Sequence, residues 1–438
     1  IYAGRPPWVN GKDGVKTINF AKSLCSETAR LTTLAIGVTI DGSARAEWLQ
    51  QQIDKSYFQI RHWVEYGCAY GTVYIKPNGQ TLDVFTPGDV LLVDYDNLGI
   101  NGIIFKDTYT EGKLFYTRLE YHRFIQTENE MYDPYIVSNR AYVSRASDSI
   151  GNPVPLEETR WAGLVYDTEP LVKTDGTRLD GPLFGMFRTP QANNVDMSVP
   201  TGLPIFREAI EELKDLDTAY SRNAGEIFDS EKIILADDTL LMPSGVNLKN
   251  TTEATREQTR KAMKLPHYVK NVFGNGTDYF YQEINPQLNT DVRLAGINAL
   301  LSQIGYKAGY SNGYFAFNEK SGMMTATQVE SDDRRTIQFI KDVRDKLEDC
   351  MNGVIYALDV FANLYGLAPI GPYKVNYDFG DITYNREEDR IRWWQYVTQN
   401  KVPAWKYFVK FEGMSKEEAK AMVEEAQPKE EPGLFAEE

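Results

Sequence analysis

The sequence predicts an α+β protein, and three observations support this class. Short runs rich in Tyr and Val between residues 72 and 145 are separated by turn signals such as Asn78-Gly79, as in an antiparallel sheet. Apolar residues spaced three or four apart come before this region, from Ile18 to Leu34 and from Arg45 to Tyr66, and they indicate two helices. A proline-free stretch from Thr325 to Tyr365 has the same helical spacing. Helices on either side of one antiparallel sheet are typical of the α+β class.

The expected strands are short and rich in β-branched and aromatic residues. They are Thr72–Lys76, Thr81–Thr86, Val90–Tyr95, Gly102–Asp107, Lys113–Phe124 and Tyr135–Arg145. Residues 166–202 are rich in Pro, Gly, Asn and Thr, so we expect an irregular crossing segment there.

Two helices with a small insert between them are expected next. The first begins near Pro204 and runs to 228, with Glu208, Glu211, Glu212, Asp215 and Asp217 covering the face opposite its apolar stripe. In the insert, residues 229–288, we expect a strand at Lys232–Leu235. Asn289-Thr290 can cap the second helix, whose apolar residues include Val292, Ala295 and Ile304. We expect the outer faces of both helices to be too polar for the two helices to complete their packing within one subunit.

The stretch from 325 to 365 predicts one long helix, which Gly366 and Pro369 end. Charges of alternating sign cover much of its surface, so we expect it to lie between neighbouring elements or subunits rather than pass through a core. Gly353 is a place where it can bend. Beyond it we expect a strand at Tyr373–Phe379, helices at Arg386–Gln399 and Ser415–Gln427, and a disordered acidic end from Pro428 to Glu438.

Composition narrows the possible functions. The chain has 438 residues and a formal charge of −15, which disfavours non-specific attraction to nucleic acid or acidic membranes. Cys25, Cys68 and Cys350 are isolated, so a disulfide framework is not expected. No apolar run approaches the 18 residues of a membrane span, so we expect no membrane partner.

Motifs that would indicate an enzyme are lacking in the sequence. His62, His122 and His267 are far apart and lack zinc-ligand spacing, and there is no phosphate-binding glycine loop and no GxSxG elbow. Asp94 to Gly99 begins like a calcium loop, but Leu98 and Phe105 occupy ligand positions. We therefore expect no catalytic residue, no metal site and no cofactor.

One acidic cluster keeps an alternative open. Glu330, Asp332 and Asp333 could hold Mg²⁺ in a metal-dependent nuclease or phosphodiesterase. Acids in the first turns of a helix also favour its positive end, and Arg334 and Arg335 follow directly, so we prefer the structural interpretation.

Two further segments are candidates for binding. The loop 311–324, with Gly313 and Gly322 near its ends, contains Tyr314, Phe315 and Phe317 and suits either an inserted ligand contact or a packed connection. A basic run in the insert includes Arg256, Arg260 and Lys264, residue types that contact either phosphates or a protein partner.

The order of these elements resembles the portal proteins of tailed bacteriophages, of the siphophage type. Similar segments are SGMMTATQVESDDRRTIQFIKDVRDKLEDCM, FREAIEELKDLDTAYSRNAGEI, VNYDFGDITYNREEDR and GMSKEEAKAM. By this resemblance the regions would be a wing (1–203), a first stem helix (204–228), a clip (229–288), a second stem helix (289–310), a tunnel loop (311–324), a long wing helix (325–369) and a crown with an acidic tail (370–438).

The resemblance implies a structural function in the virion rather than an enzyme. Identical subunits, usually twelve, would form a ring at one capsid vertex, after assembly in the host cytoplasm, and double-stranded DNA would pass through it during packaging and ejection. Tyr314, Phe315, Phe317, Asn318 and Lys320 would face the DNA in the channel. Arg256, Arg260 and Lys264 would serve partner docking or contact between subunits at the clip. The implied partners are further copies of the chain, the large terminase subunit, the scaffold and major capsid proteins, and a head-completion or adaptor protein; another ring-forming head–tail adaptor is the remaining alternative.

Overall fold

The fold mixes helices and strands, which occupy 43% and 24% of the chain, so the mixed α and β class expected from the sequence is confirmed. The chain forms two compact units, one of residues 1–322 and 332–380 and the other of residues 323–331 and 381–438. The computed structural model describes residues 1–11, 14–79, 81–96, 99–125, 133–173, 176–229, 233–237, 269–272, 281–284, 290–316, 334–380, 386–399, 401–412 and 414–426.

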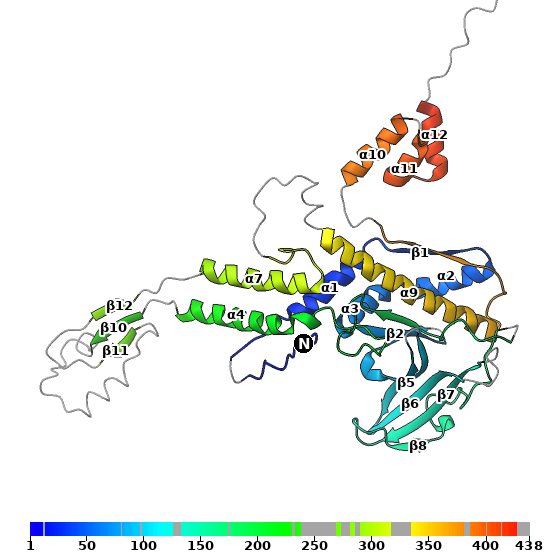
Figure 1. The fold of residues 1–438 in the computed structure, drawn as a ribbon, viewed down its shortest axis with the longest axis horizontal. Helices are drawn as coiled ribbons and strands as arrows, with labels where there is room; N and C mark the ends of the chain where they lie inside the picture. Colours follow the sequence, from blue (N-terminus) through cyan, green and yellow to red (C-terminus); the bar gives the residue numbers. More distant parts are fainter. Residues whose placement is uncertain are drawn as a thin grey trace, which may run out of the picture. The chain divides into compact units, whose positions relative to one another are not determined.

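A five-stranded antiparallel sheet occupies the middle of the first unit's sequence (Figure 1). Its strands, in spatial order, are β4 (Val90–Tyr95), β5 (Ile100–Glu111), β6 (Leu114–Phe124), β7 (Tyr135–Ser144) and β8 (Asn152–Val154). Four predicted strands are confirmed here. Phe105 of β5 packs against Tyr74, Phe85 and Phe184, so aromatic rings join this sheet to its neighbour.

A second sheet has the order β3–β2–β9, with β2 (Thr72–Asn78), β3 (Thr81–Phe85) and β9 (Gly185–Arg188). The strand β9 lies inside the segment expected to be irregular, and that expectation is wrong for these residues. A strand of four residues is too short for its alternation to stand out among prolines and glycines. A third pairing joins β1 (Gly37–Asp41), which was not predicted, to β13 (Lys374–Asp378), which was.

The N-terminal helices are α1 (Phe20–Thr32), α2 (Ala44–Ser56) and α3 (Ile60–Tyr70). The prediction of one helix over 45–66 is wrong, because the 3₁₀ turn η1 (Tyr57–Gln59) separates α2 from α3. The Tyr57 hydroxyl donates a hydrogen bond to the Ile36 carbonyl oxygen, a tertiary contact that the apolar spacing does not reveal. The other 3₁₀ turns are η2 (Pro87–Asp89), η3 (Leu156–Glu158) and η4 (Arg207–Ala209).

The long helix α9 (Arg334–Leu364) forms part of the core of the first unit. It contacts β9, β2, α1 and α2, and its buried face includes Ile340, Val343, Leu347, Met351 and Val354. The expectation that it lies outside a core is therefore wrong, because most of its charged residues cover the opposite face. The exception, Arg344, is buried and donates hydrogen bonds to the carbonyl oxygens of Leu31 and Thr32 in α1. Residues 325–333, where the sequence placed its beginning, are outside the described part of the chain.

Gly353 allows a close approach of the chain rather than marking a break in α9. A Cβ atom there would lie 3.0 Å from the Gly185 Cα atom. A Cβ atom on Gly185 would lie 2.3 Å from the Cys350 carbonyl oxygen. The two glycines thus let β9 lie directly on the helix backbone.

Two further helices, α4 (Ile210–Asp229) and α7 (Thr290–Ala308), lie side by side (Figure 1). Between them in the sequence are β10 (Ile233–Asp237), β11 (Val269–Val272) and β12 (Tyr281–Ile284), with β10 parallel to β11 and antiparallel to β12. The strand predicted at Lys232–Leu235 is confirmed as β10. The helix expected from Pro204 instead begins with the turn η4 and becomes α-helical at Ile210.

The second unit contains α10 (Arg386–Thr398), α11 (Ala404–Glu412) and α12 (Lys416–Ala426). Phe411 of α11 packs against Trp393 of α10 and against Tyr407, with ring centroids 6.1 and 5.0 Å apart. The predicted C-terminal helices are thus confirmed, and aromatic side chains hold them together. Searched over the described part of the chain, no helix combines the length and the hydropathy of a membrane span.

Candidate functional site

The paired helices α4 and α7 form the first part of the candidate site. Both bury apolar residues, among them Leu213 and Leu216 of α4 and Leu301 and Ile304 of α7. The Lys307 ammonium group of α7 donates hydrogen bonds to the Glu212 carboxylate of α4 and to the Glu208 carbonyl oxygen of the preceding turn η4. Lys307 therefore joins α7 to the beginning of α4. Its ion pair lowers the pKa of Glu212.

Asp217 of α4 is buried, although the sequence placed it on the helix surface. Its carboxylate accepts hydrogen bonds from the Trp8 indole N–H and the Ile18 backbone N–H, both 2.9 Å long. One turn further, the Ser221 hydroxyl accepts from the Lys16 backbone N–H. The N-terminal arm is thus held along α4 by side chains of that helix.

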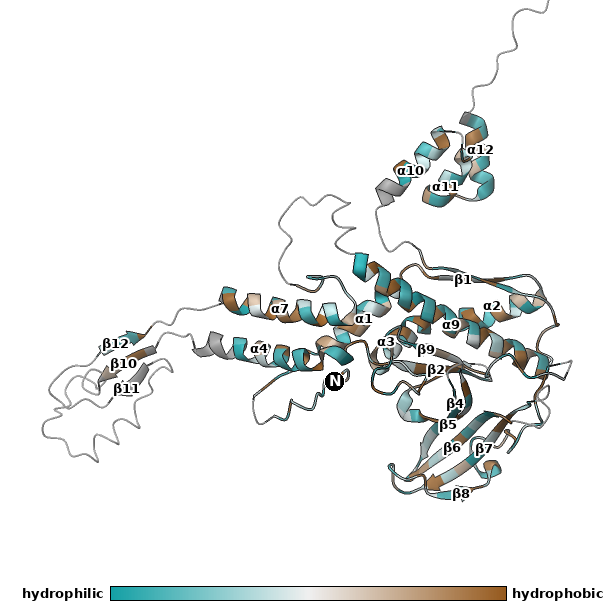
Figure 2. Ribbon diagram, in the orientation of Figure 1, coloured by the Kyte–Doolittle hydropathy of each residue, from teal (hydrophilic) through white to brown (hydrophobic). Residues whose placement is uncertain are grey.

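The outer faces of the two helices differ. Glu208 of η4 and Glu211 and Asp215 of α4 are exposed, as the sequence predicted, and the basic residues Lys214 and Arg222 of α4 are exposed as well. On α7 the exposed residues Val292, Ala295, Gly296, Ala299 and Gln303 recur at helical spacing and carry no charge. Val292 is 74% exposed. We call these five residues the α7 stripe, and Figure 2 shows hydrophobic and hydrophilic residues interleaved along both helices.

The α7 stripe corrects the sequence prediction in one respect. The outer face of α7 is not polar, and Val292 and Ala295, counted as part of its apolar face, point to solvent. The missed signal is that apolar and small residues occur on two faces of this helix rather than one. Small residues on an exposed face allow the backbone of another element to approach closely.

The turn after α7, residues 311–316, is fixed to α1 and α9. Ser311 and Thr336 exchange hydrogen bonds, with the Ser311 N–H donating to the Thr336 hydroxyl at 2.9 Å and the Thr336 N–H to the Ser311 hydroxyl at 3.2 Å. The Tyr310 and Thr28 hydroxyls are 2.6 Å apart. The chain therefore leaves this turn from a rigid base.

The predicted DNA-facing residues Tyr314 and Phe315 lie on this turn with their rings turned into the protein. The Tyr314 hydroxyl donates to the Glu27 carboxylate at 2.6 Å, and the Phe315 ring packs edge-on against Phe20 and Tyr310. Arg30, followed by Tyr314, lowers the pKa of Glu27 below its ordinary value despite partial burial. The sequence left open whether this loop is an inserted ligand contact or a packed connection. The contacts of residues 311–316 fit the packed connection.

The other residues singled out in the sequence lie outside the described part of the chain. These are Phe317, Asn318 and Lys320 of the expected tunnel loop, Arg256, Arg260 and Lys264 of the insert, and Glu330, Asp332 and Asp333 of the acidic cluster. Their roles stay predictions.

A buried charge network, which the sequence did not suggest, joins two sheets of the first unit. Glu120 of β6 contacts the Lys76 ammonium group at 2.9 Å, the Arg118 guanidinium at 2.8 Å and His122 Nε2 at 2.9 Å. Burial alone would raise the pKa of Glu120. The neighbouring Lys76, His122 and Arg118, of which Lys76 has the largest effect, outweigh burial, so the pKa of Glu120 is lowered. Burial lowers the pKa of His122.

The network continues to a polar cleft of about 750 Å³, whose lining includes Asp107, Arg118, Arg160 and Trp161. Asp107 accepts hydrogen bonds from Arg160 at 2.7 Å and from the Trp161 indole at 3.0 Å. Because these charges pair with one another, the network is best explained as a structural link.

Within the ranges that the structure describes, no group of three His, Cys, Asp or Glu residues is placed to hold a metal ion. Comparison with models of protein families finds no match for this chain, and none of the curated proteins matches its sequence.

Proposed function

We propose that this chain is a portal protein of a tailed bacteriophage, one subunit of a ring through which double-stranded DNA is packaged and ejected. The observation that carries the proposal is the α4–α7 pair. Two adjacent helices enclose a small β-containing insert in the sequence, and the second leads through a fixed turn towards the long helix α9. This is the element order of the family that the sequence resembles.

The α7 stripe supports assembly into a ring. An uncharged helix face with Val292 at 74% exposure is costly to leave in water, and a neighbouring subunit would cover it. The exposed face of α4 carries charged residues and so differs from the stripe, and contact between these two different surfaces makes a head-to-tail interface. Interfaces of that type close into rings when the rotation between subunits allows it.

Three exposed acids in η4 and the first turns of α4 suit a conduit. Glu208, Glu211 and Asp215 are exposed, and carboxylates facing a duplex repel its phosphates. Screening limits this repulsion to about 8 Å at physiological salt, so it prevents adhesion without blocking passage. On this proposal the chain has no catalytic role, and its partners are further copies of itself, the terminase motor, capsid and scaffold proteins, and a head-completion protein.

The test is to place charge in the α7 stripe. The double variant A295E/A299E should stay folded, because both positions are exposed, but should fail to assemble. The substitution A162E, at an exposed position of the first unit outside α4 and α7, is the control for adding a carboxylate and should assemble as wild type does. Native mass measurement reads out the assembly state. Unchanged assembly of the double variant would argue against the proposal, as would Mg²⁺-dependent DNA cleavage by the purified chain.

A further inference from the structure

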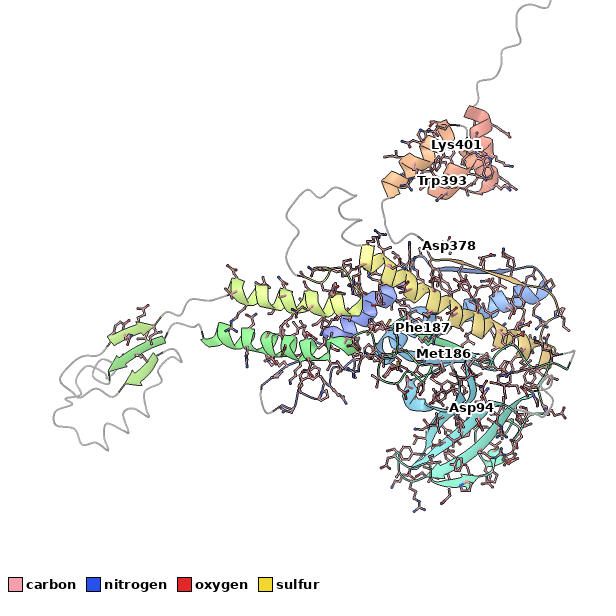
Figure 3. The ribbon with its side chains drawn as sticks, in the orientation of Figure 1. Asp94, Met186, Phe187, Asp378, Trp393 and Lys401 are labelled. Carbon is pink, nitrogen blue, oxygen red and sulfur yellow. The ribbon has the colours of Figure 1, made fainter. Side chains whose placement is uncertain are left out.

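The C-terminal helices bring several lysines close to aromatic rings. Residues 386–426 contain eight Lys and Arg and eight Asp and Glu, so this segment is neutral overall, while the whole chain carries −15. Five of the eight basic residues are lysines, and each of these five lies near an aromatic ring. Figure 3 labels Trp393 of α10 and Lys401 of the following turn in this unit.

Three of these lysines surround one indole. The ammonium nitrogens of Lys406, Lys416 and Lys420 lie 5.7, 5.7 and 5.5 Å from the ring centroid of Trp405. The distance between any two of these nitrogens is therefore at most about twice their distance from the Trp405 centroid. That limit is near the distance over which salt screens charges at physiological ionic strength. Lys416 and Lys420 are also four residues apart on α12, where like charges repel. We call these three residues the lysine cluster.

Two acidic residues near the lysine cluster have other partners. Glu412 pairs with Arg390 of α10. The Glu418 carboxylate accepts hydrogen bonds from the N–H and hydroxyl of Ser415, which caps α12. In the described part of the chain no ion pair engages any lysine of the cluster. Contact with the face of one indole offsets only part of the repulsion among three cations, since such a contact contributes about 0.5–1 kcal/mol at an exposed site.

We propose that the lysine cluster is a phosphate-contacting site for the backbone of double-stranded DNA. Duplex DNA carries one negative charge per about 1.7 Å of its axis, so it can present several phosphates to three ammonium groups gathered at one ring. Lysine contacts of this type are independent of base sequence, which suits a site that meets any part of a genome. The choice of DNA as the polyanion rests on the proposed function; the gathering of three lysines around Trp405 does not.

The exposed acids of α4 and the lysine cluster act on DNA in opposite ways. Carboxylates facing a duplex repel its phosphates, whereas the lysine cluster attracts them. On this proposal the first unit lets DNA slide past and the second unit holds it. Because the contact is electrostatic, it should weaken steeply as salt rises.

The test measures binding of the full-length protein to a fluorescent duplex of mixed sequence. The triple variant K406Q/K416Q/K420Q should lose roughly tenfold in affinity at low salt, and its logarithmic salt dependence should become shallower by about 0.9 for each phosphate contact removed. The charge-preserving variant K406R/K416R/K420R should bind like wild type. The matched control K22Q/K106Q/K113Q removes three exposed lysines of the first unit and should change affinity and salt dependence little.

Two outcomes would overturn the inference. Equal losses in the cluster and control variants would mean that net charge alone sets binding. Unchanged DNA binding with weakened self-association would mean that the lysine cluster contacts an acidic protein surface instead. Circular dichroism of each variant checks folding, and the arginine variant decides the matter if the glutamine variant unfolds. Because the measurement does not require a ring, its failure is distinct from failure of the proposed function.

Discussion

Lys307 of α7 donates hydrogen bonds to two oxygen atoms at once, one from the Glu212 carboxylate of α4 and one from the Glu208 backbone carbonyl of η4. The two helices are therefore joined at this end within a single chain. The surface of α7 that stays exposed, and that another chain can contact, is the uncharged α7 stripe from Val292 to Gln303.

Replacing Lys307 by Gln should lower the free energy of unfolding only modestly. The Lys307 side chain is 40% exposed, and exposed ion pairs contribute up to about 1 kcal/mol. Urea unfolding measures the change, with K214Q on the exposed face of α4 as the control. A loss well above 2 kcal/mol would show that Lys307 holds more than these two helices.

Replacing Asp217 by Ala should release the N-terminal arm. The buried carboxylate accepts two hydrogen bonds from the arm, and leaving those donors unsatisfied costs about 1–3 kcal/mol each. Hydrogen exchange of residues 8–18 should become faster, while exchange in the five-stranded sheet should not. T218A, which removes an exposed hydroxyl from the same helix, is the control, and equal protection in both variants would refute the assigned role of Asp217.

Replacing Gly185 by Ala should destabilise the first unit by about 1–3 kcal/mol, as overpacking does. The added Cβ atom would meet the Cys350 carbonyl oxygen at 2.3 Å and the Val354 Cγ2 atom at 2.6 Å, and backbone atoms cannot yield cheaply. The matched control is G163A, where no atom lies within 4 Å of the added Cβ. Urea unfolding should separate the two variants; similar midpoints would contradict the contact between β9 and α9.

Stability should fall as the pH is lowered from 7 to 5. Burial lowers the pKa of His122, so the unfolded chain takes up a proton below about pH 6.5 that the folded protein does not. The contribution of His122 is thus complete above that pH and is lost as the pH falls, by at most about 1.4 kcal/mol per pH unit. Glu120 acts in the same direction at lower pH, because its pKa is also lowered in the folded state.

The variant H122F should make the free energy of unfolding less dependent on pH between pH 7 and 5. It also removes the contact between His122 Nδ1 and the Tyr135 hydroxyl, which are 2.8 Å apart. The control H62Q removes an exposed imidazole of α3 instead. An unchanged slope for H122F in urea unfolding at several pH values would show that His122 is not the group responsible.

The sequence was sufficient where a single local pattern decides the structure. The strands from Thr72 to Ser144 and the helix α9 have the periodicity of their class over many residues, and both were predicted. The sequence was insufficient where tertiary contacts decide the local structure. A 3₁₀ turn at Tyr57–Gln59 separates α2 from α3, and β9, a strand of four residues in a proline-rich segment, lies against α9 where Gly185 allows a close approach of the two backbones.

The candidate site was predictable in outline and not in its surfaces. Periodicity located α4 and α7, but it could not say which of two apolar faces of α7 is buried, nor that Asp217 turns inward to Trp8. The lysine cluster was equally hidden, because Lys406 belongs to α11 while Lys416 and Lys420 belong to α12, and only the packing of these helices brings them to Trp405.

The central claim is that the chain completes its packing in a ring around a hole wide enough for duplex DNA. Single-particle images of the purified wild-type protein test this most directly. We expect closed annular particles with a central opening and a mass that is a whole-number multiple of the 49.9 kDa chain, about twelvefold in the family that the sequence resembles. A homogeneous population of single chains at high protein concentration, with no annular particles, would contradict the claim.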